Sequence, residues 1–247
     1  MSVATAPSIR KGPLLIAPLE RTVDPATEAA PPLGTGSPVT EQRFVLNSID
    51  WQSYRAISNA LTGRHLRITY DRGRLELNKV SSLRGTLGRL FHNLIAILTE
   101  EFSLPCGGCG DMTCDRESLE RGIEPDECFY IENEAKVRGK DNLDMSVDPP
   151  PDLAVEIDLS RDSRRRLSIY AALGVPEVWR FDGTSLTVYV RQANGEYETV
   201  PVSPHFPSIP PTEIEAILKR RHEMDDNALM KLFRARVREL MGSPHDN

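Results

Sequence analysis

The chain has 247 residues, of which 39% are hydrophobic, and a formal net charge of −6. This length and composition predict one globular domain with additions, and the negative charge excludes a protein that coats nucleic acid through bulk positive charge. No stretch reaches the roughly 18 apolar residues of a membrane span, and the N-terminus lacks the order of a signal peptide. We therefore expect a cytoplasmic protein with no membrane partner.

Composition divides the chain into three segments. The first 40 residues hold seven of the nineteen prolines and show no sustained apolar period, which predicts a disordered tail over residues 1–42. The folded domain is expected over residues 43–222, because periodic apolar patterns fill that range. Residues 223–247 are expected to form an amphipathic C-terminal helix and tail, whose apolar stripe could pack on its own core or on a partner.

The first half of the folded domain predicts two helices with a hairpin between them. Ser48 is a candidate cap for a helix that starts near Trp51 and ends at Gly63. Residues 66–70 and 75–78 alternate apolar and polar side chains around an Asp-Arg-Gly turn, which indicates a β-hairpin. An apolar stripe at helical spacing then predicts a long helix over residues 86–102.

The second half predicts strands around one crossover helix. The apolar run at residues 128–131 is short enough to be a central strand, and residues 132–148 form a charged surface excursion. Residues 153–182 read as strand, helix and parallel strand, with Ser160 and Asp162 as candidate helix caps. A meander over residues 186–202 follows. Thr212 and Glu215 match a capping box, and residues 229–240 form a last helix.

The most informative pattern is the strand at residues 153–159. Side chains alternate faces with period two, so Glu156 and Asp158 lie on one side, and Leu153 and Val155 lie on the other. Two such carboxylates, about 6 to 7 Å apart, repel by roughly 2 to 3 kcal/mol at an effective dielectric near 20. A divalent metal, an arginine or a lysine would remove this repulsion. The alternative is a solvated edge face paired with surface basic residues.

The four cysteines suggest a second kind of metal site. Cys106 and Cys109 are separated by two glycines, and Cys114 and Cys128 follow. Four thiols could hold zinc, although their spacing matches no common structural-zinc pattern. A zinc-stabilised module is therefore kept as a hypothesis about function, beside the two that are stated at the end of this section.

The segment PPDLAVEIDLSRDSRRRLSIYAALGVPEVWRFDG, at residues 150–183, resembles the Uma-two family of restriction endonucleases in the PD-(D/E)XK nuclease superfamily. Residues 64–77 and 121–131 extend the resemblance, which covers roughly residues 44–220. It implies an α/β (α+β) fold with a restriction-endonuclease-like core, in which helices flank a mixed central β-sheet. It also implies a DNA substrate, and it suggests a homodimer.

The resemblance assigns roles to individual residues. Asp126 stands for the superfamily's first strand acid, and Glu156 stands for the acid of its (D/E)XK strand. Both are expected to bind Mg²⁺, with Mn²⁺ as the alternative cation, and Asp158 is a further candidate ligand. Glu76 matches a family acid at the rim of the site. Arg166 lies where the family places its lysine and is expected to clamp the scissile phosphate.

Three departures from the superfamily and family patterns affect this site, and the third concerns its front. Asp158 stands where the superfamily motif has its lysine, and Arg166 cannot readily act as a base because arginine keeps its proton. Residues 78–84 replace an expected Met-Ser-Pro and a downstream histidine. The leading hypothesis is thus a metal-dependent phosphodiester hydrolase, an endonuclease acting on DNA. The alternative is a catalytically inactive binding or interaction protein that keeps the nuclease fold.

Overall fold

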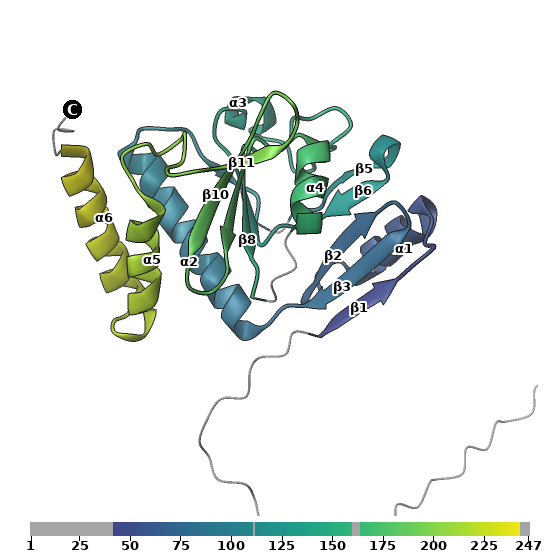
Figure 1. The fold of residues 1–247 in the computed structure, drawn as a ribbon, viewed down its shortest axis with the longest axis horizontal. Helices are drawn as coiled ribbons and strands as arrows, with labels where there is room; N and C mark the ends of the chain where they lie inside the picture. The colour runs from purple at the N-terminus through teal and green to yellow at the C-terminus, as the bar shows by residue number, and fades with distance from the viewer. Residues whose placement is uncertain (1–41, 111, 160–163, 243–247) are drawn as a thin grey trace, which may run out of the picture. The chain divides into compact units, whose positions relative to one another are not determined.

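The computed structural model describes residues 42–110, 112–159 and 164–242. In these residues the strands form two sheets (Figure 1). The small sheet is antiparallel, in the order β1 (Arg43–Leu46), β3 (Arg74–Lys79), β2 (Leu66–Asp71), β6 (Arg121–Ile123), β5 (Cys114–Arg116). The large sheet is mixed, in the order β11 (Tyr197–Val200), β10 (Leu186–Arg191), β9 (Glu177–Phe181), β8 (Leu153–Ile157), β7 (Glu127–Tyr130), β4 (Gly107–Gly108).

Helices flank both sheets, so the predicted fold class, a mixed central sheet between helices, is confirmed. The α-helices are α1 (Trp51–Leu61), α2 (Ser82–Glu101), α3 (Glu134–Val137), α4 (Arg164–Leu173), α5 (Pro211–Lys219) and α6 (Asp226–Gly242). Two 3₁₀ turns complete the described elements, Glu117–Leu119 and Arg220–His222. No helix among the described residues is long and apolar enough to cross a membrane.

The small sheet is built on the predicted hairpin. Arg72 and Gly73 connect β2 to β3 with φ values of 45° and 88°, the left-handed conformation that a two-residue hairpin turn requires. Helix α1 covers one face of this sheet, where Tyr54 stacks on Tyr70 with their ring centroids 4.5 Å apart. The opposite face carries the polar side chains of β2 and β3, and it is turned toward the start of α4.

Strand β8 lies inside the large sheet, between antiparallel β7 and parallel β9. Leu153, Val155 and Ile157 pack with α2, α5 and α6 on one face, while Ala154 packs with α4 on the other. All five residues of β8 are buried, so the alternative of a solvated edge face is wrong. The predicted crossover is confirmed: α4 connects two parallel strands and ends before Gly174, whose φ is 85°.

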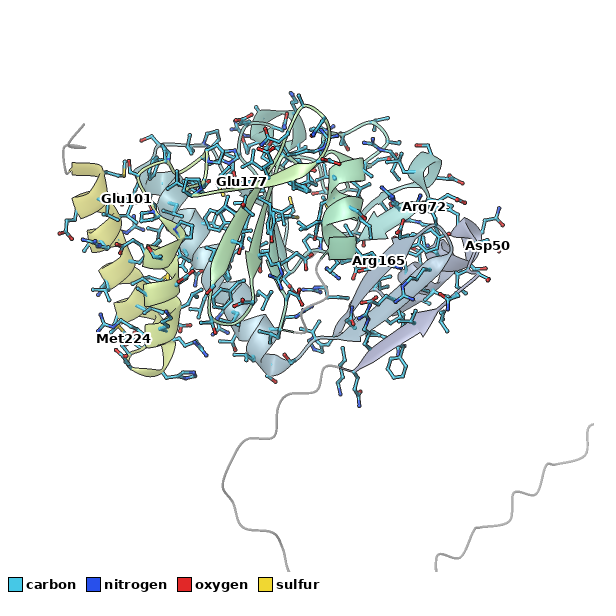
Figure 2. The ribbon with its side chains drawn as sticks, in the orientation of Figure 1. Asp50, Arg72, Glu101, Arg165, Glu177 and Met224 are labelled. Carbon is cyan, nitrogen blue, oxygen red and sulfur yellow. The ribbon has the colours of Figure 1, made fainter. Side chains whose placement is uncertain are left out.

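Helix α6 packs along α2, and Leu229, Phe233 and Val237 are fully buried in the shared core. Its apolar stripe therefore faces the protein's own core. Two arginines of α6 form ion pairs with the end of α2. Arg238 and Arg234 both contact Glu101, at the end of α2 that is labelled in Figure 2.

Two predicted helix caps are wrong. Ser48 has a left-handed φ of 58°, and Asp50 caps α1 instead by accepting the backbone N–H of Ser53 at 2.7 Å. Helix α5 begins after Pro210 without a side-chain cap, and Glu215 accepts the N–H of Leu186 across the fold. The predicted tail, residues 1–42, lies almost entirely outside the described residues, as do the candidate caps Ser160 and Asp162.

Candidate functional site

Two acids come together where β7 begins and β8 ends, on the side of the large sheet that faces the small sheet. Asp126 directly precedes β7, and Glu156 lies in β8. The Asp126 carboxylate accepts the backbone N–H of Ile157, the residue after Glu156, with Oδ2 at 2.7 Å from the nitrogen. Both side chains are almost completely buried, with 2% and 5% of their surface exposed. The antiparallel pairing of β7 with β8 thus brings together the two acids that the sequence predicted.

Helix α4 supplies the partners of Glu156. Arg166 donates from Nη2 to Glu156 Oε1 at 2.7 Å, and Tyr170 donates its hydroxyl to the same oxygen. The two residues are four apart and therefore lie on one face of the helix. Burial and the nearby carboxylate raise the pKa of Tyr170 well above its ordinary value. Tyr170 is a fully buried core residue, and it also fixes the orientation of the Glu156 carboxylate.

Arg166 connects the two sheets. Its Nη1 donates to Thr69 Oγ1 of β2 at 2.8 Å, and its Nη2 also donates to the carbonyl of Glu124 at 3.1 Å. Although burial lowers the pKa of Arg166, the charge of Glu156 raises it above the ordinary value. Arg166 therefore stays protonated and can bind an anion, but it cannot accept a proton. Its neighbour Arg165 is exposed at the start of α4 (Figure 2).

Two further arginines surround Asp126. Arg67 Nε, from β2, and Arg84 Nη1, from the first turn of α2, each lie 3.7 Å from Asp126 Oδ1. Arg84 also donates from Nη2 to the carbonyl of Ile157. Burial raises the pKa of Asp126 to about 6; the charge of Arg84 opposes this shift and that of Glu156 adds to it. The site is thus a buried cluster of opposite charges.

One oxygen of each acid has no hydrogen-bond partner among the described residues. These buried atoms are Asp126 Oδ1 and Glu156 Oε2. An unsatisfied buried carboxylate oxygen is costly, and divalent cations such as Mg²⁺ bind carboxylate oxygens. No group of three or more His, Cys, Asp or Glu side chains in the described part of the chain is placed to hold a metal. Two carboxylates nevertheless fit Mg²⁺, which takes its other ligands from water and substrate phosphate.

The other two predicted acids lie beside this pair. Asp158 Oδ2 is 3.1 Å from both Nε and Nη2 of Arg180, and it shares a cavity of about 10 Å³ with Glu156 and Arg166. A cavity of this volume has room for about one water molecule. Glu76 accepts from Arg43 at 2.5 Å and from Asn78 at 2.9 Å, so its partners lie on the small sheet. The roles of Asp158 and Glu76 stay predictions.

The sequence interpretation missed Arg67 and Arg84. Arg67 is the second residue of the alternating strand β2, and Arg84 is a cation in the first turn of α2. Cations are disfavoured at that end of a helix. The unfavourable position of its charge was therefore the available signal that Arg84 has a buried partner.

The cysteines lie apart from this site. All four are free thiols, and Cys114 and Cys128 are buried. Each of these two donates to a nearby backbone carbonyl, of Met112 and Gly110 respectively. They do not belong to any metal-holding group of the described residues. The zinc module stays an untested hypothesis.

Comparisons with known proteins identify a family for this chain. The family model described as "Uma2: Putative restriction endonuclease" matches residues 51–218. A similar solved structure is described as "a putative nuclease belonging to DUF820 from Anabaena variabilis". It is 15% identical, with a TM-score of 0.43, and the alignment covers 61% of this chain and 90% of that one. No curated protein matches the chain.

Proposed function

The chain belongs to the Uma2 family, and we propose that it is a metal-dependent phosphodiester hydrolase, an endonuclease acting on DNA. One observation carries the proposal. Asp126 Oδ1 and Glu156 Oε2 are buried carboxylate oxygens without hydrogen-bond partners among the described residues, and they come from two adjacent strands. This arrangement supports a site that holds a cation more readily than it supports a purely structural salt-bridge network.

Asp126 and Glu156 would hold Mg²⁺ or Mn²⁺, with Asp158 as a candidate third ligand. When bound, the cation would lower the pKa of a coordinated water and offset negative charge on the phosphate. Arg166 and Tyr170 keep Glu156 Oε1 occupied, so Oε2 stays the oxygen available to a ligand. Burial excludes competing water from these oxygens and strengthens every charge interaction among them.

Arg166 has the second role in this proposal. Its guanidinium donates to Glu156, Thr69 and Glu124, while its Nε is buried without a hydrogen-bond partner among the described residues. A phosphate oxygen could accept a hydrogen bond from that N–H. Arg166 thus binds and orients the anion, and the proton of the attacking water must go to another group.

The test is plasmid nicking in Mg²⁺ and Mn²⁺ by the wild-type protein, Glu156→Gln and Glu198→Gln. Glu198 is an exposed glutamate on β11 and serves as the matched control. We expect Glu156→Gln to lower the cleavage rate at least about 100-fold, as loss of a group that stabilises the transition state does, while Glu198→Gln cleaves like wild type. Melting curves confirm that both variants fold. Absence of cation-dependent cleavage, or equal cleavage by Glu156→Gln, would contradict the proposal.

A second candidate function is DNA binding without catalysis. The observation that favours it is the number of arginines that already compensate the acids: Arg67, Arg84, Arg166 and Arg180. Such a protein would bind DNA equally well in Mg²⁺ and in a chelator, and would leave the plasmid intact. An electrophoretic mobility assay beside the nicking assay therefore separates the two candidates.

A further inference from the structure

Arg84 lies where a helix does not favour a cation. It is the third residue of α2, and its backbone N–H donates to the capping hydroxyl of Ser81 at 3.2 Å. The positive end of the helix dipole disfavours a guanidinium there, and 93% of the side chain's surface is buried, since its exposed fraction is 7%. A specific set of acceptors must therefore hold Arg84 inside the protein.

Two oxygens of the candidate metal site interact with Arg84, one through an ion pair and one through a hydrogen bond. Arg84 Nη1 lies 3.7 Å from Asp126 Oδ1, the carboxylate oxygen without a hydrogen-bond partner among the described residues. Its Nη2 donates to the carbonyl oxygen of Ile157, the residue that follows Glu156. One guanidinium thus connects Asp126, the residue before β7, to the backbone of β8. A divalent cation that binds Asp126 would meet the positive charge of Arg84 at the same oxygen.

We propose that Arg84 is an internal counter-ion that competes with the divalent cation for Asp126. Arg84, together with Arg67 on the other side of the same oxygen, compensates the charge of the buried carboxylate without metal. Binding of a divalent cation requires the guanidinium to withdraw from Oδ1, so Arg84 weakens metal affinity. This inference rests on the proposed function, because it assumes that the cation binds Asp126. It goes further by assigning a role to a residue in the segment, 78–84, that departs from the family pattern.

The experiment measures Mn²⁺ binding to the full-length protein by isothermal titration calorimetry, without DNA. It compares wild type, Arg84→Gln, Arg89→Gln, Asp126→Asn and the double variant Arg84→Gln/Asp126→Asn. Arg89 is an exposed arginine on the same helix, paired with Asp226 at 3.2 Å, and is the matched control. Arg84→Met, which keeps the stem and removes the charge, replaces Arg84→Gln if the glutamine variant does not fold.

We expect Arg84→Gln to bind Mn²⁺ at least about tenfold more tightly than wild type, and Arg89→Gln to match wild type. The double variant should lose the gained affinity. A second readout is the melting temperature, which Mn²⁺ should raise more in Arg84→Gln than in wild type. These results together support the role of Arg84.

Two other outcomes would overturn the inference, and they differ from each other. If wild type and Arg84→Gln bind Mn²⁺ equally and Asp126→Asn abolishes binding to both, the metal site stands and Arg84 does not compete. If no variant binds Mn²⁺, or if Asp126→Asn leaves binding to Arg84→Gln unchanged, the proposed metal site fails and this inference fails with it.

Discussion

His205 forms a buried charge pair far from the candidate active site. Its Nδ1 lies 2.6 Å from Oε2 of Glu177, at the start of β9 (Figure 2), and the indole N–H of Trp179 donates to the other carboxylate oxygen at 2.6 Å. Burial alone would lower the pKa of His205, but the hydrogen bond and charge of Glu177 raise it above 6.5. Glu132 and Asp152 add to this upward shift.

The sign of this shift predicts how stability depends on pH. A histidine whose pKa is higher in the folded state stabilises that state fully below its unfolded pKa, about 6.5, and the contribution is lost as the pH rises through the folded pKa. We expect the free energy of unfolding of wild type to fall more steeply between pH 6 and pH 8.5 than that of His205→Gln. Urea unfolding at the two pH values measures this. The exposed His222→Gln is the control; an equal pH dependence in His205→Gln and wild type would refute the prediction.

Single residues also show which parts of the site a sequence can predict. Glu156 and Asp158 share a face because alternation along one strand is a local property, and the charge density of that strand predicted a cationic partner. Arg84, a partner of Asp126, could not be found in this way, because it lies in a different element. Its other contact, the carbonyl of Ile157, is 73 residues away in the chain. Only the tertiary fold decides which of the chain's arginines becomes a buried counter-ion.

At the scale of an element, the β2–β3 turn depends on backbone conformation. Gly73 has a φ of 88°, which a residue with a Cβ atom adopts only with strain. Gly85, in the first turns of α2, has helical geometry, and a Cβ there would have no neighbour within 4 Å among the described residues. The same substitution should therefore have opposite effects at these two glycines.

We expect Gly73→Ala to lower the free energy of unfolding by about 1 kcal/mol or more, because alanine is strained at positive φ. Gly85→Ala should raise it by about 0.5 to 1 kcal/mol, because alanine has the higher helix propensity. Chemical denaturation of both variants beside wild type provides the measurement. A stabilised Gly73→Ala would show that the turn does not need a left-handed residue.

Elements with a strong apolar period were predicted correctly, but some of their ends and caps were not. The stripe over residues 86–102 identified α2, which in fact begins four residues earlier, because Ser81 caps it through a local hydrogen bond. For α5, Thr212 and Glu215 have the spacing of a capping box, yet Glu215 is drawn to the N–H of Leu186 on β10. Cap residues have several competing partners, and tertiary contacts choose among them.

At the scale of the whole molecule, the sequence predicted the mixed α/β class and the crossover between β8 and β9. It did not predict that the hairpin would belong to a separate sheet. Hairpin strands alternate in the same way whether they join the central sheet or form another. Arg166 spans from Glu156 of the large sheet to Thr69 of the small one, and Arg67 of the small sheet lies beside Asp126, so buried polar contacts make the two sheets interdependent.

This interdependence predicts that the two sheets unfold together. The chain has two tryptophans, and each reports on one sheet: Trp51 packs on Tyr54 and Tyr70 beside the small sheet, and Trp179 is buried in the large one. In Trp51→Phe and Trp179→Phe, fluorescence during urea unfolding follows the remaining tryptophan. We expect both transitions to coincide with the loss of circular dichroism in the same variant, because buried ion pairs connect the sheets.

In Arg166→Met, which leaves Glu156 buried without its arginine, the small-sheet transition should occur at lower urea concentration. Separate transitions without that substitution would show that the sheets are independent units, and that the site between them is not held together by Arg166.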